Sequence, residues 1–346
     1  MRLSVWSFIV DQWRRQPPAL KADLAGKTVV ILGANTGIGF EASKHFATMN
    51  PQKLILACRS QSKGQAAVAK LKAETGYSKA ELWIIDLADF SSVRQFADRF
   101  EREAGRLDIL VENAAIGSFT YTPTKDNWDI SLQVNHLSTS LLALLLLPAM
   151  IRTAQRHSTT PRLVVVSSGA HHWVEVDKKL YENPDVLKTL GGAEYCSNPK
   201  NMQGRYPLTK LFNIFFVRAL NTRLPPSTSL VVNAVDPGYC YSELRREFSG
   251  MMAVFDWLME KALAFSAEVG SRRLVWAALS HQDQPEKLRG EYSSNFNIME
   301  VSDFALSPEG VRMQDRSWVE LVEILGKVDP RVTAIVDEYL SHSIVV

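Results

Sequence analysis

The chain has few cysteines, no N-glycosylation sequon and almost no net charge. Its three cysteines, Cys58, Cys196 and Cys240, are too few for a disulfide framework in 346 residues, and Asn-x-Ser/Thr does not occur. Both absences favour a reducing cytosolic compartment or the cytosolic face of a membrane. A formal net charge of +2, without a long run of one sign, gives no basis for nucleic-acid binding. We therefore expect small molecules as partners.

Motifs of three other kinds of site are also absent. Ser167 and Ser168 do not stand in a Gly-x-Ser-x-Gly elbow, which argues against a hydrolase. The glycine-rich segment near the N-terminus lacks the Gly-Lys-Ser/Thr of a Walker loop. His171 and His172 have no cysteine, aspartate or glutamate partner at ligand spacing, so we expect no metal site and exposed or capping histidines.

The sequence does contain alternating strand and helix patterns from Thr28 to Val235, and 46% of its residues are hydrophobic. This alternation predicts one large α/β domain. We place the domain at residues 26–300. A short amphipathic extension precedes it at 1–25, and a helical extension follows at 301–346.

A glycine-rich loop follows the first predicted strand. The apolar run 27–32 leads directly into Gly33-Ala34-Asn35-Thr36-Gly37-Ile38-Gly39, after which a helix pattern continues to Ala47. Free backbone N–H groups at the start of a helix bind a pyrophosphate, and glycines let the backbone come close to it. We predict a dinucleotide site, for which an ordinary glycine-rich turn is the alternative. Its predicted cofactor-binding residues are Gly33, Asn35, Thr36, Gly37, Ile38 and Gly39.

The next strands end in residues suited to the rest of such a cofactor. Arg59 follows the strand 53–58, where an NAD-binding chain usually has an acidic residue for the ribose 2′-hydroxyl. A guanidinium binds a 2′-phosphate through two parallel hydrogen bonds, so Arg59, with Lys63 nearby, favours NADP(H); a solvated arginine is the alternative. Asp86 and the pair Asn113-Ala114 end later strands and suit the adenosine, although each also suits a cap or a turn.

Tyr206 and Lys210 form the most informative pair. On a helix, four-residue spacing places both side chains on one face, so the ammonium favours the ionised phenol. The ordinary pKa of a phenol is near ~10, and lowering it makes Tyr206 a usable general acid or base. Ser168 would supply a second hydrogen bond to the substrate oxygen. We prefer it to Ser167 because it directly precedes the Gly169-Ala170 turn.

In this order the motifs resemble those of the short-chain dehydrogenases/reductases, over about residues 26–297. The matched positions are the loop 33–39, Asp86, Asn113-Ala114, Asn135, Ser168, Tyr206, Lys210 and Asp236-Pro237-Gly238. The resemblance implies a Rossmann-like doubly wound parallel sheet with helices on both faces. It also implies that Asn135 positions a water that resupplies Lys210 with protons. Leu87, Pro237, Gly238 and Ser242 would join the cofactor site.

Within this family the chain is most similar to retinol-dehydrogenase-like reductases and their fungal relatives. The similarity rests on Ala57-Cys58-Arg59-Ser60 and on the added C-terminal segment. Departures from the family pattern fall at Leu32, Glu112, Ala115 and Ser242, none of which is a catalytic position.

Three further segments bear on the substrate and on assembly. The thirty-seven residues between Ser168 and Tyr206 exceed the family's usual connection and are expected to roof the substrate cleft. Residues 239–265 predict either an apolar lid over a lipophilic substrate or an amphipathic helix buried against the sheet. The leucine-rich run 141–147, in a helix expected at about 126–153, is too short before Pro148 to span a bilayer. Core packing and a dimer face both explain it, so the sequence allows a monomer or a homodimer.

Residues 1–15 predict a short helix with aromatic and basic edges. A signal peptide is one alternative, but the segment lacks a convincing small-residue cleavage site. Peripheral contact with the cytosolic face of a membrane and simple packing on the domain are the others. The C-terminal segment predicts amphipathic helices near 309–325 and 329–340.

From the sequence we predict an NADP(H)-dependent oxidoreductase that interconverts a carbonyl and an alcohol on a lipophilic small molecule. A terpenoid, steroid, retinoid-like compound or polyketide would suit, and we expect the reductive direction because of the inferred NADPH preference. One alternative is an NAD-linked alcohol dehydrogenase. The other is a catalytically silent NADP-binding sensor, suggested by the altered positions Leu32, Glu112 and Ala115.

Overall fold

The computed structural model of the chain describes residues 5–242, 244 and 250–341. The predicted segments 1–25, 239–265 and 301–346 therefore each include residues outside the description, namely 1–4, 243, 245–249 and 342–346.

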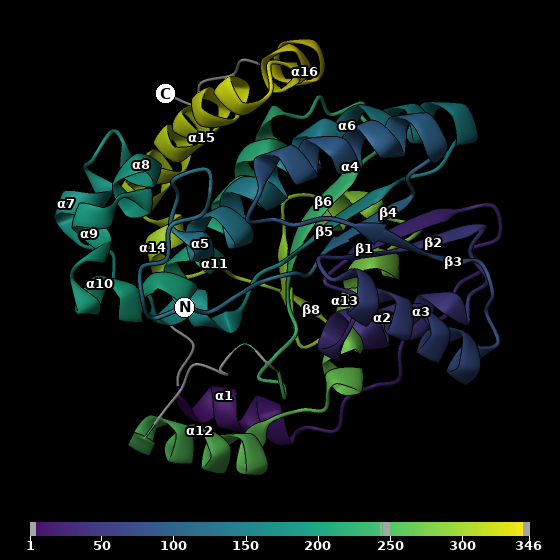
Figure 1. Cartoon of the computed structure of the whole chain (residues 1–346), viewed down its shortest axis with the longest axis horizontal. Helices are drawn as coiled ribbons and strands as arrows, with labels where there is room; N and C mark the ends of the chain where they lie inside the picture. Colours follow the sequence, from purple (N-terminus) through teal and green to yellow (C-terminus); the bar gives the residue numbers. More distant parts are fainter. Residues whose placement is uncertain (1–4, 243, 245–249, 342–346) are drawn as a thin grey trace.

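An eight-stranded sheet forms the centre of the molecule, in the order β3-β2-β1-β4-β5-β6-β7-β8 (Figure 1). The strands are β1 (Thr28–Leu32), β2 (Lys53–Cys58), β3 (Ala80–Ile84), β4 (Ile109–Glu112), β5 (Arg162–Val166), β6 (Val231–Asp236), β7 (Tyr292–Ser294) and β8 (Asn297–Met299). Neighbours from β3 through β7 pair in parallel, and β8 is antiparallel to β7. The strand order reverses between β1 and β4, which is the kind of switch point where open α/β sheets bind ligands. The predicted doubly wound sheet is confirmed.

Helices cover both faces of the sheet. One face carries α2 (Gly37–Ala47), α3 (Gln61–Thr75) and α13 (Ala267–Leu279); the other carries α4 (Phe90–Glu103), α5 (Ile130–Leu132), η1 (Gln133–Leu137), α6 (Ser138–His157) and α11 (Arg205–Arg223). Successive strand residues point to opposite faces, so Val29 and Ile31 join one core while Val30 and Leu32 join the other. The central strands β1, β4, β5 and β6 are buried at every residue, as parallel strands covered on both faces are, whereas the edge strand β8 is exposed.

The leucine-rich run 141–147 is buried by the chain itself. α4 packs against α6, as does α16 (Arg331–Tyr339) from the C-terminal extension. Among the described residues, 130–157 is the one helical stretch long and apolar enough to cross a membrane, and its apolar window is 100% buried. The stretch begins after Asp129, whose side chain accepts the amide of Leu132, and ends before Ser158, which has a φ of 50°, so the expected bounds 126–153 are corrected to 130–157. Core packing rather than a dimer face explains the leucines.

The insertion between β5 and α11 folds into short helices. They are η2 (Gly169–Trp173), α7 (Lys178–Tyr181), α8 (Val186–Gly191), α9 (Ala193–Cys196) and α10 (Pro199–Gln203). The carboxylate of Glu320, on α15 (Pro308–Val328), accepts the amides of Leu187 at 2.8 Å and Lys188 at 2.9 Å. The segment expected to roof the substrate cleft is thus anchored on the C-terminal extension.

The remaining elements lie around this body. They are η4 (Pro285–Leu288), α14 (Asp303–Leu306), and the pair α1 (Val5–Trp13) and α12 (Gly250–Leu263). α1 and α12 lie side by side, set apart from the sheet (Figure 1). This arrangement contradicts the alternative that residues 239–265 form a helix buried against the sheet.

Candidate active site

The predicted motifs meet at one edge of the sheet. Each parallel strand from β1 to β6 is followed by a predicted site residue. These residues are Gly33 after β1, Arg59 after β2, Asp86 after β3, Asn113 after β4, Ser168 after β5 and Pro237 after β6. Parallel strands all end on the same side, so residues from 33 to 238 along the chain come together there.

The glycine loop fits a pyrophosphate. Gly33 and Gly37 have φ values of +68° and +59°, which side-chain-bearing residues rarely adopt. A Cβ on Gly39 would lie 2.4 Å from the carbonyl oxygen of Gly33, so only glycine fits there. Thr36, the N-cap residue of α2, makes no side-chain capping bond, and the first-turn N–H groups of a helix have no partner within it. Backbone donors and the positive helix end thus face the loop.

The end of β2 offers an accessible cation. Arg59 is exposed, and no ion pair holds it within the described part of the chain. The amide of Gly33 donates to the carbonyl of Ala57 at 2.9 Å, which ties the glycine loop to the strand that carries Arg59. Ser60 then caps α3 by accepting the amide of Lys63 at 3.4 Å. The arrangement fits a phosphate on the ribose of a cofactor lying across β1 and β2.

The residues after β3 and β4 also hold the local backbone. Asp86 Oδ1 accepts the amide of Ala88 at 2.9 Å, a turn bond, and the carbonyl of Leu87 accepts the hydroxyl of Ser138 at 2.6 Å. Asn113 Nδ2 donates to the carbonyl of Leu32 at 3.1 Å. A Cβ on Gly33 would lie 3.0 Å from Cα of Ala114. The bond of Asn113 thus ties the segment after β4 to the end of β1, and the bond of Leu87 ties the segment after β3 to α6.

Lys210 is the central buried charge of the site. Its Nζ donates to the carbonyl of Val166 at 2.7 Å and lies 5.6 Å from the centre of the Tyr206 ring. Burial lowers the pKa of Lys210 to about 7. The hydroxyl of Ser167 is buried and donates to the carbonyl of Lys210 at 2.9 Å, whereas Ser168 is half-buried at the start of η2. The hydroxyl of Ser167 is thus already used in a hydrogen bond to α11, and Ser168 remains as the candidate serine.

Asn135 lies in a π-helical turn, η1, that the sequence analysis did not predict. Its side-chain amide exchanges two hydrogen bonds with the backbone of Ile116, both 2.8 Å, and donates to Thr209 Oγ1 at 3.1 Å. Thr209 directly precedes Lys210, and its hydroxyl donates to the carbonyl of Tyr206 at 2.8 Å. The Asn135 side chain thus fixes the loop after β4 against the helix of the tyrosine and lysine. π-turns often occur at functional sites.

Asp236 holds the site together in a way that the sequence analysis missed. Its Oδ1 accepts the amides of Gly169 at 3.0 Å and Gly238 at 3.1 Å, and its Oδ2 accepts the hydroxyl of Ser294 at 2.9 Å. It therefore connects the turn after Ser168 with the Pro-Gly turn. An aspartate directly before Pro-Gly at a strand end was the available signal.

His171 corrects the expectation of exposed or capping histidines, because it is fully buried. Its Nε2 accepts the amide of Ser302 at 3.3 Å, so Nδ1 carries the proton and donates to the carbonyl of Ser168 at 2.7 Å. Burial lowers its pKa to about 4, which keeps the ring neutral. His171 thus joins the C-terminal extension to the backbone of the candidate serine.

The Pro-Gly turn is tightly packed. Gly238 has φ +80°, and a Cβ there would lie 2.7 Å from Nη1 of Arg273. Further on, Ser242 is exposed, and its hydroxyl accepts the amide of Leu244 at 3.4 Å. Gly238 thus lies in the turn after β6, whereas Ser242 is exposed.

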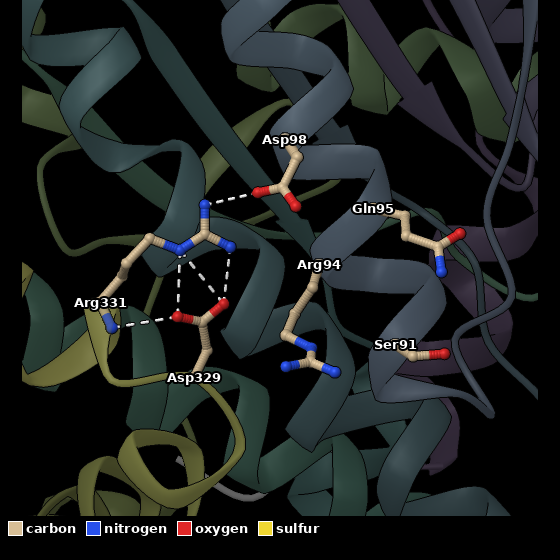
Figure 2. Close-up of a pocket in the computed structure, with 6 residues that line it drawn as sticks. All are labelled: Ser91, Arg94, Gln95, Asp98, Asp329 and Arg331. Carbon is tan, nitrogen blue, oxygen red and sulfur yellow. Dashed lines mark hydrogen bonds and ion pairs between the residues drawn. The ribbon is translucent and has the colours of Figure 1, made fainter.

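A polar hollow between α4 and α16 is a separate feature (Figure 2). It is lined by Ser91, Arg94, Gln95, Asp98, Asp329 and Arg331, none of which is a predicted site residue. Arg331 pairs with both Asp98 and Asp329 at 2.6 Å. These ion pairs fasten the C-terminal extension to α4, and the hollow is distinct from the sheet edge.

Proteins of one family are similar to the chain over most of its length. The profile of the family described as short chain dehydrogenase matches residues 27–181. The short chain dehydrogenase/reductase dmxR8 of Cryptosporiopsis sp. is 35% identical over 94% of this chain and 99% of its own length. The short-chain dehydrogenase anuD of Penicillium roqueforti is 36% identical over 95% of this chain and 85% of its own.

Solved structures share the fold. An uncharacterized protein of Mycobacterium paratuberculosis superposes with a TM-score of 0.63 at 26% identity, covering 89% of this chain and 97% of its own. The L-sorbose reductase of Gluconobacter frateurii, solved with NADPH and L-sorbose, gives a TM-score of 0.55 at 19% identity, covering 78% of this chain and 96% of its own.

Proposed function

The chain belongs to the short-chain dehydrogenase family, and we propose that it is an NADP(H)-dependent oxidoreductase that interconverts a carbonyl and an alcohol on a lipophilic small molecule. A terpenoid, steroid, retinoid-like compound or polyketide would suit the apolar lid, and we propose the reductive direction. The observation that carries the proposal is the buried Lys210 ammonium, held 5.6 Å from the Tyr206 ring by the end of β5. A helix face that brings a lysine to a tyrosine beside a glycine cradle suits hydride-transfer chemistry.

The cofactor would rest on Gly33–Gly39, with the 2′-phosphate at Arg59 and the adenosine beside Asp86 and Asn113. When bound, it supplies or accepts the hydride. The glycine cradle and the exposed position of Arg59 support this placement. The NADPH in the structure of the L-sorbose reductase is in line with it.

The side chains of this protein then handle the proton. As hydride reaches a carbonyl carbon, negative charge develops on its oxygen, to which Tyr206 donates its hydroxyl proton and Ser168 a hydrogen bond. The Lys210 cation favours the phenolate that remains. Asn135 positions this helix through Thr209, 3.1 Å away. In the oxidative direction Tyr206 takes the proton back.

We also propose that the reaction takes place in the cytosol or at the cytosolic face of a membrane. The three cysteines, all within the described part of the chain, are buried and form no disulfide, which is in line with a reducing compartment. With its leucine-rich helix covered by α4 and α16, we propose that the chain works as a monomer.

The test is the oxidation of NADPH and of NADH by the purified chain with a panel of lipophilic aldehydes and ketones. We expect turnover with NADPH that is lost in Tyr206→Phe while cofactor binding persists. Equal turnover with NADH would favour the NAD-linked alternative. Cofactor binding without turnover on any substrate would favour the silent sensor.

A further inference from the structure

Exposed apolar residues gather on α1 and α12. On α1, Trp6 is 71% exposed, and Trp13, two turns later, is exposed as well. On α12, Met251 is 90% exposed, and further exposed apolar residues follow it at spacings of three and four residues, on one face of the helix. These are Val254, Leu258 and, beside them, Trp257. We call this pair of helices with its outward face the α1–α12 platform.

The platform is one unit because Gln12 joins its parts. The buried side chain of Gln12 donates to the carbonyls of Tyr239 and Leu263, both at 2.8 Å, which are near the start and the end of the segment 239–265. The indole N–H of Trp13 donates to the carbonyl of Ala262 at 3.1 Å. Phe265 returns beside Tyr239, whose carbonyl accepts its amide at 2.8 Å. α1 therefore closes the base of the segment that carries α12.

The inner side of the platform borders the candidate active site. The ring of Phe8 packs edge-on against Trp173 at 5.4 Å and Tyr239 at 6.2 Å. Trp173 ends η2, which begins one residue after Ser168, and Tyr239 directly follows Gly238. The outward apolar face is thus one helix away from the segments that flank the reacting groups.

We propose that the α1–α12 platform docks on the surface of a bilayer that contains anionic phospholipid. α1 has 9 residues and α12 has 14, so neither can span a bilayer, but both can lie in its interface. Tryptophan prefers that interface, because its ring is apolar while its N–H still finds a partner. The purpose of this docking rests on the proposed function. Docking would place the lid segment 239–265 at the bilayer, where a lipophilic substrate is dissolved.

Charge favours anionic lipid over a second copy of the chain. Of the charged groups at the platform, Arg14 pairs with Asp11 at 3.4 Å, Asp256 accepts the hydroxyl of Tyr239 at 2.9 Å, and Glu260 is half-buried. Arg15 and Lys261 border the platform and are exposed. Two copies docked face to face would bring these cations together. An anionic surface would instead attract all of them, by about 1 kcal/mol for each cation near it.

The test is flotation of the full chain with vesicles of phosphatidylcholine, with and without phosphatidylserine. We expect binding to the vesicles with phosphatidylserine, weakened by high salt. In the double variant Val254→Ser/Leu258→Ser the bound fraction should fall at least about tenfold. The matched control is Val319→Ser/Leu306→Ser, which changes the same residue types at 65% and 47% exposure instead of 60% and 54%. It should bind within about twofold of the wild type.

Three outcomes would overturn the proposal. They are no flotation of the wild type, equal loss in the control, and a wild-type dimer that the platform variant alone dissociates without any vesicle binding. Circular dichroism confirms that each variant is folded. Turnover of a water-soluble aldehyde without vesicles is measured in parallel, so that a failure of docking and a failure of the proposed chemistry are distinguished.

Discussion

The carboxyl edge of the sheet and the α1–α12 platform are built in opposite ways. At the sheet edge the polar groups are inside, and Lys210 and Ser167 are both buried and bonded to backbone carbonyls. On the platform the apolar groups are outside, and one buried polar side chain, Gln12, holds the helices together. The sheet edge is held by many hydrogen bonds at the ends of its strands, whereas the α1–α12 platform is held by only a few hydrogen bonds. We therefore expect substitutions at the edge to change chemistry and substitutions at the platform to change access.

A chain of polar contacts connects the two regions. Asp236 holds the turns after Ser168 and before Tyr239, and Nη1 of Arg273 lies 3.7 Å from its carboxylate. Nη2 of Arg273 in turn donates to the side chain of Gln16 at 3.2 Å, just after α1. Substitutions in each region test whether the two are as distinct as their construction indicates.

The largest effect is expected at Tyr206. Tyr206→Phe removes the proton donor and should reduce kcat by about 10²- to 10⁴-fold, while the melting temperature and cofactor binding change little. Tyr181→Phe, a half-buried tyrosine in the insertion, is the matched control and should keep full activity. Steady-state kinetics and cofactor titration measure both, and equal activity in the two variants would remove Tyr206 from the chemistry.

Lys210→Met should reduce turnover by at least about 100-fold and also change the pH dependence of stability. The pKa of this lysine is about 7 when folded and 10.5 in its ordinary state. Between these values the unfolded chain binds more protons, so the wild type gains stability as pH rises, by at most ~1.4 kcal/mol per pH unit. Below pH 7 the burial penalty is fully present.

The variant lacks this titration, so the wild type should gain stability relative to it between pH 7 and 10. Urea unfolding at several pH values measures the difference. Lys72→Met, at an exposed position on α3, should follow the wild type at every pH. A difference between the wild type and Lys210→Met that stays constant with pH would contradict the assigned burial effect.

Arg59→Asp should reduce kcat/KM for NADPH by about 10- to 100-fold, because a charge-assisted bidentate contact is replaced by repulsion. The value for NADH should not fall, since a carboxylate at this position suits a ribose 2′-hydroxyl. Arg156→Asp, exposed at the end of α6, is the control and should leave both values unchanged. An equal loss of kcat/KM with NADPH and with NADH would indicate that Arg59 does not bind the 2′-phosphate.

The smallest effect is expected at Gln12. Gln12→Ala leaves two carbonyls without their donor, which costs about 1–3 kcal/mol locally. Hydrogen exchange of α12 should speed up at least about fivefold, while the melting temperature falls by only a few degrees. Gln52→Ala, at an exposed turn, should change neither. If Gln12→Ala lost most of its turnover with a water-soluble substrate, the platform would be part of the catalytic region.

The sequence predicted the sheet edge well because its signals are local. A buried strand, a glycine loop and a helix are consecutive in the chain, and strand ends of a parallel sheet must meet, so Gly33 and Ser168 could be placed together without coordinates. Asp86 and Asn113 were placed at the correct edge, but their bonds to Ala88 and Leu32 could not be predicted. Asn135 could be identified from its motif, but its π-turn could not be predicted, because the turn depends on how Thr209 and Ile116 pack around the side chain.

By itself, the sequence determined the fold class, the order of the motifs and the side of the sheet on which they lie, because periodicity and glycine positions act over a few residues. Only the tertiary structure decided which surfaces cover which. The C-terminal extension covers the leucine-rich helix, His171 is buried under Ser302, and Gln12 closes a segment more than 220 residues away in the chain. Such contacts depend on the shapes and the remaining polar groups of surfaces that exist only after the chain has folded.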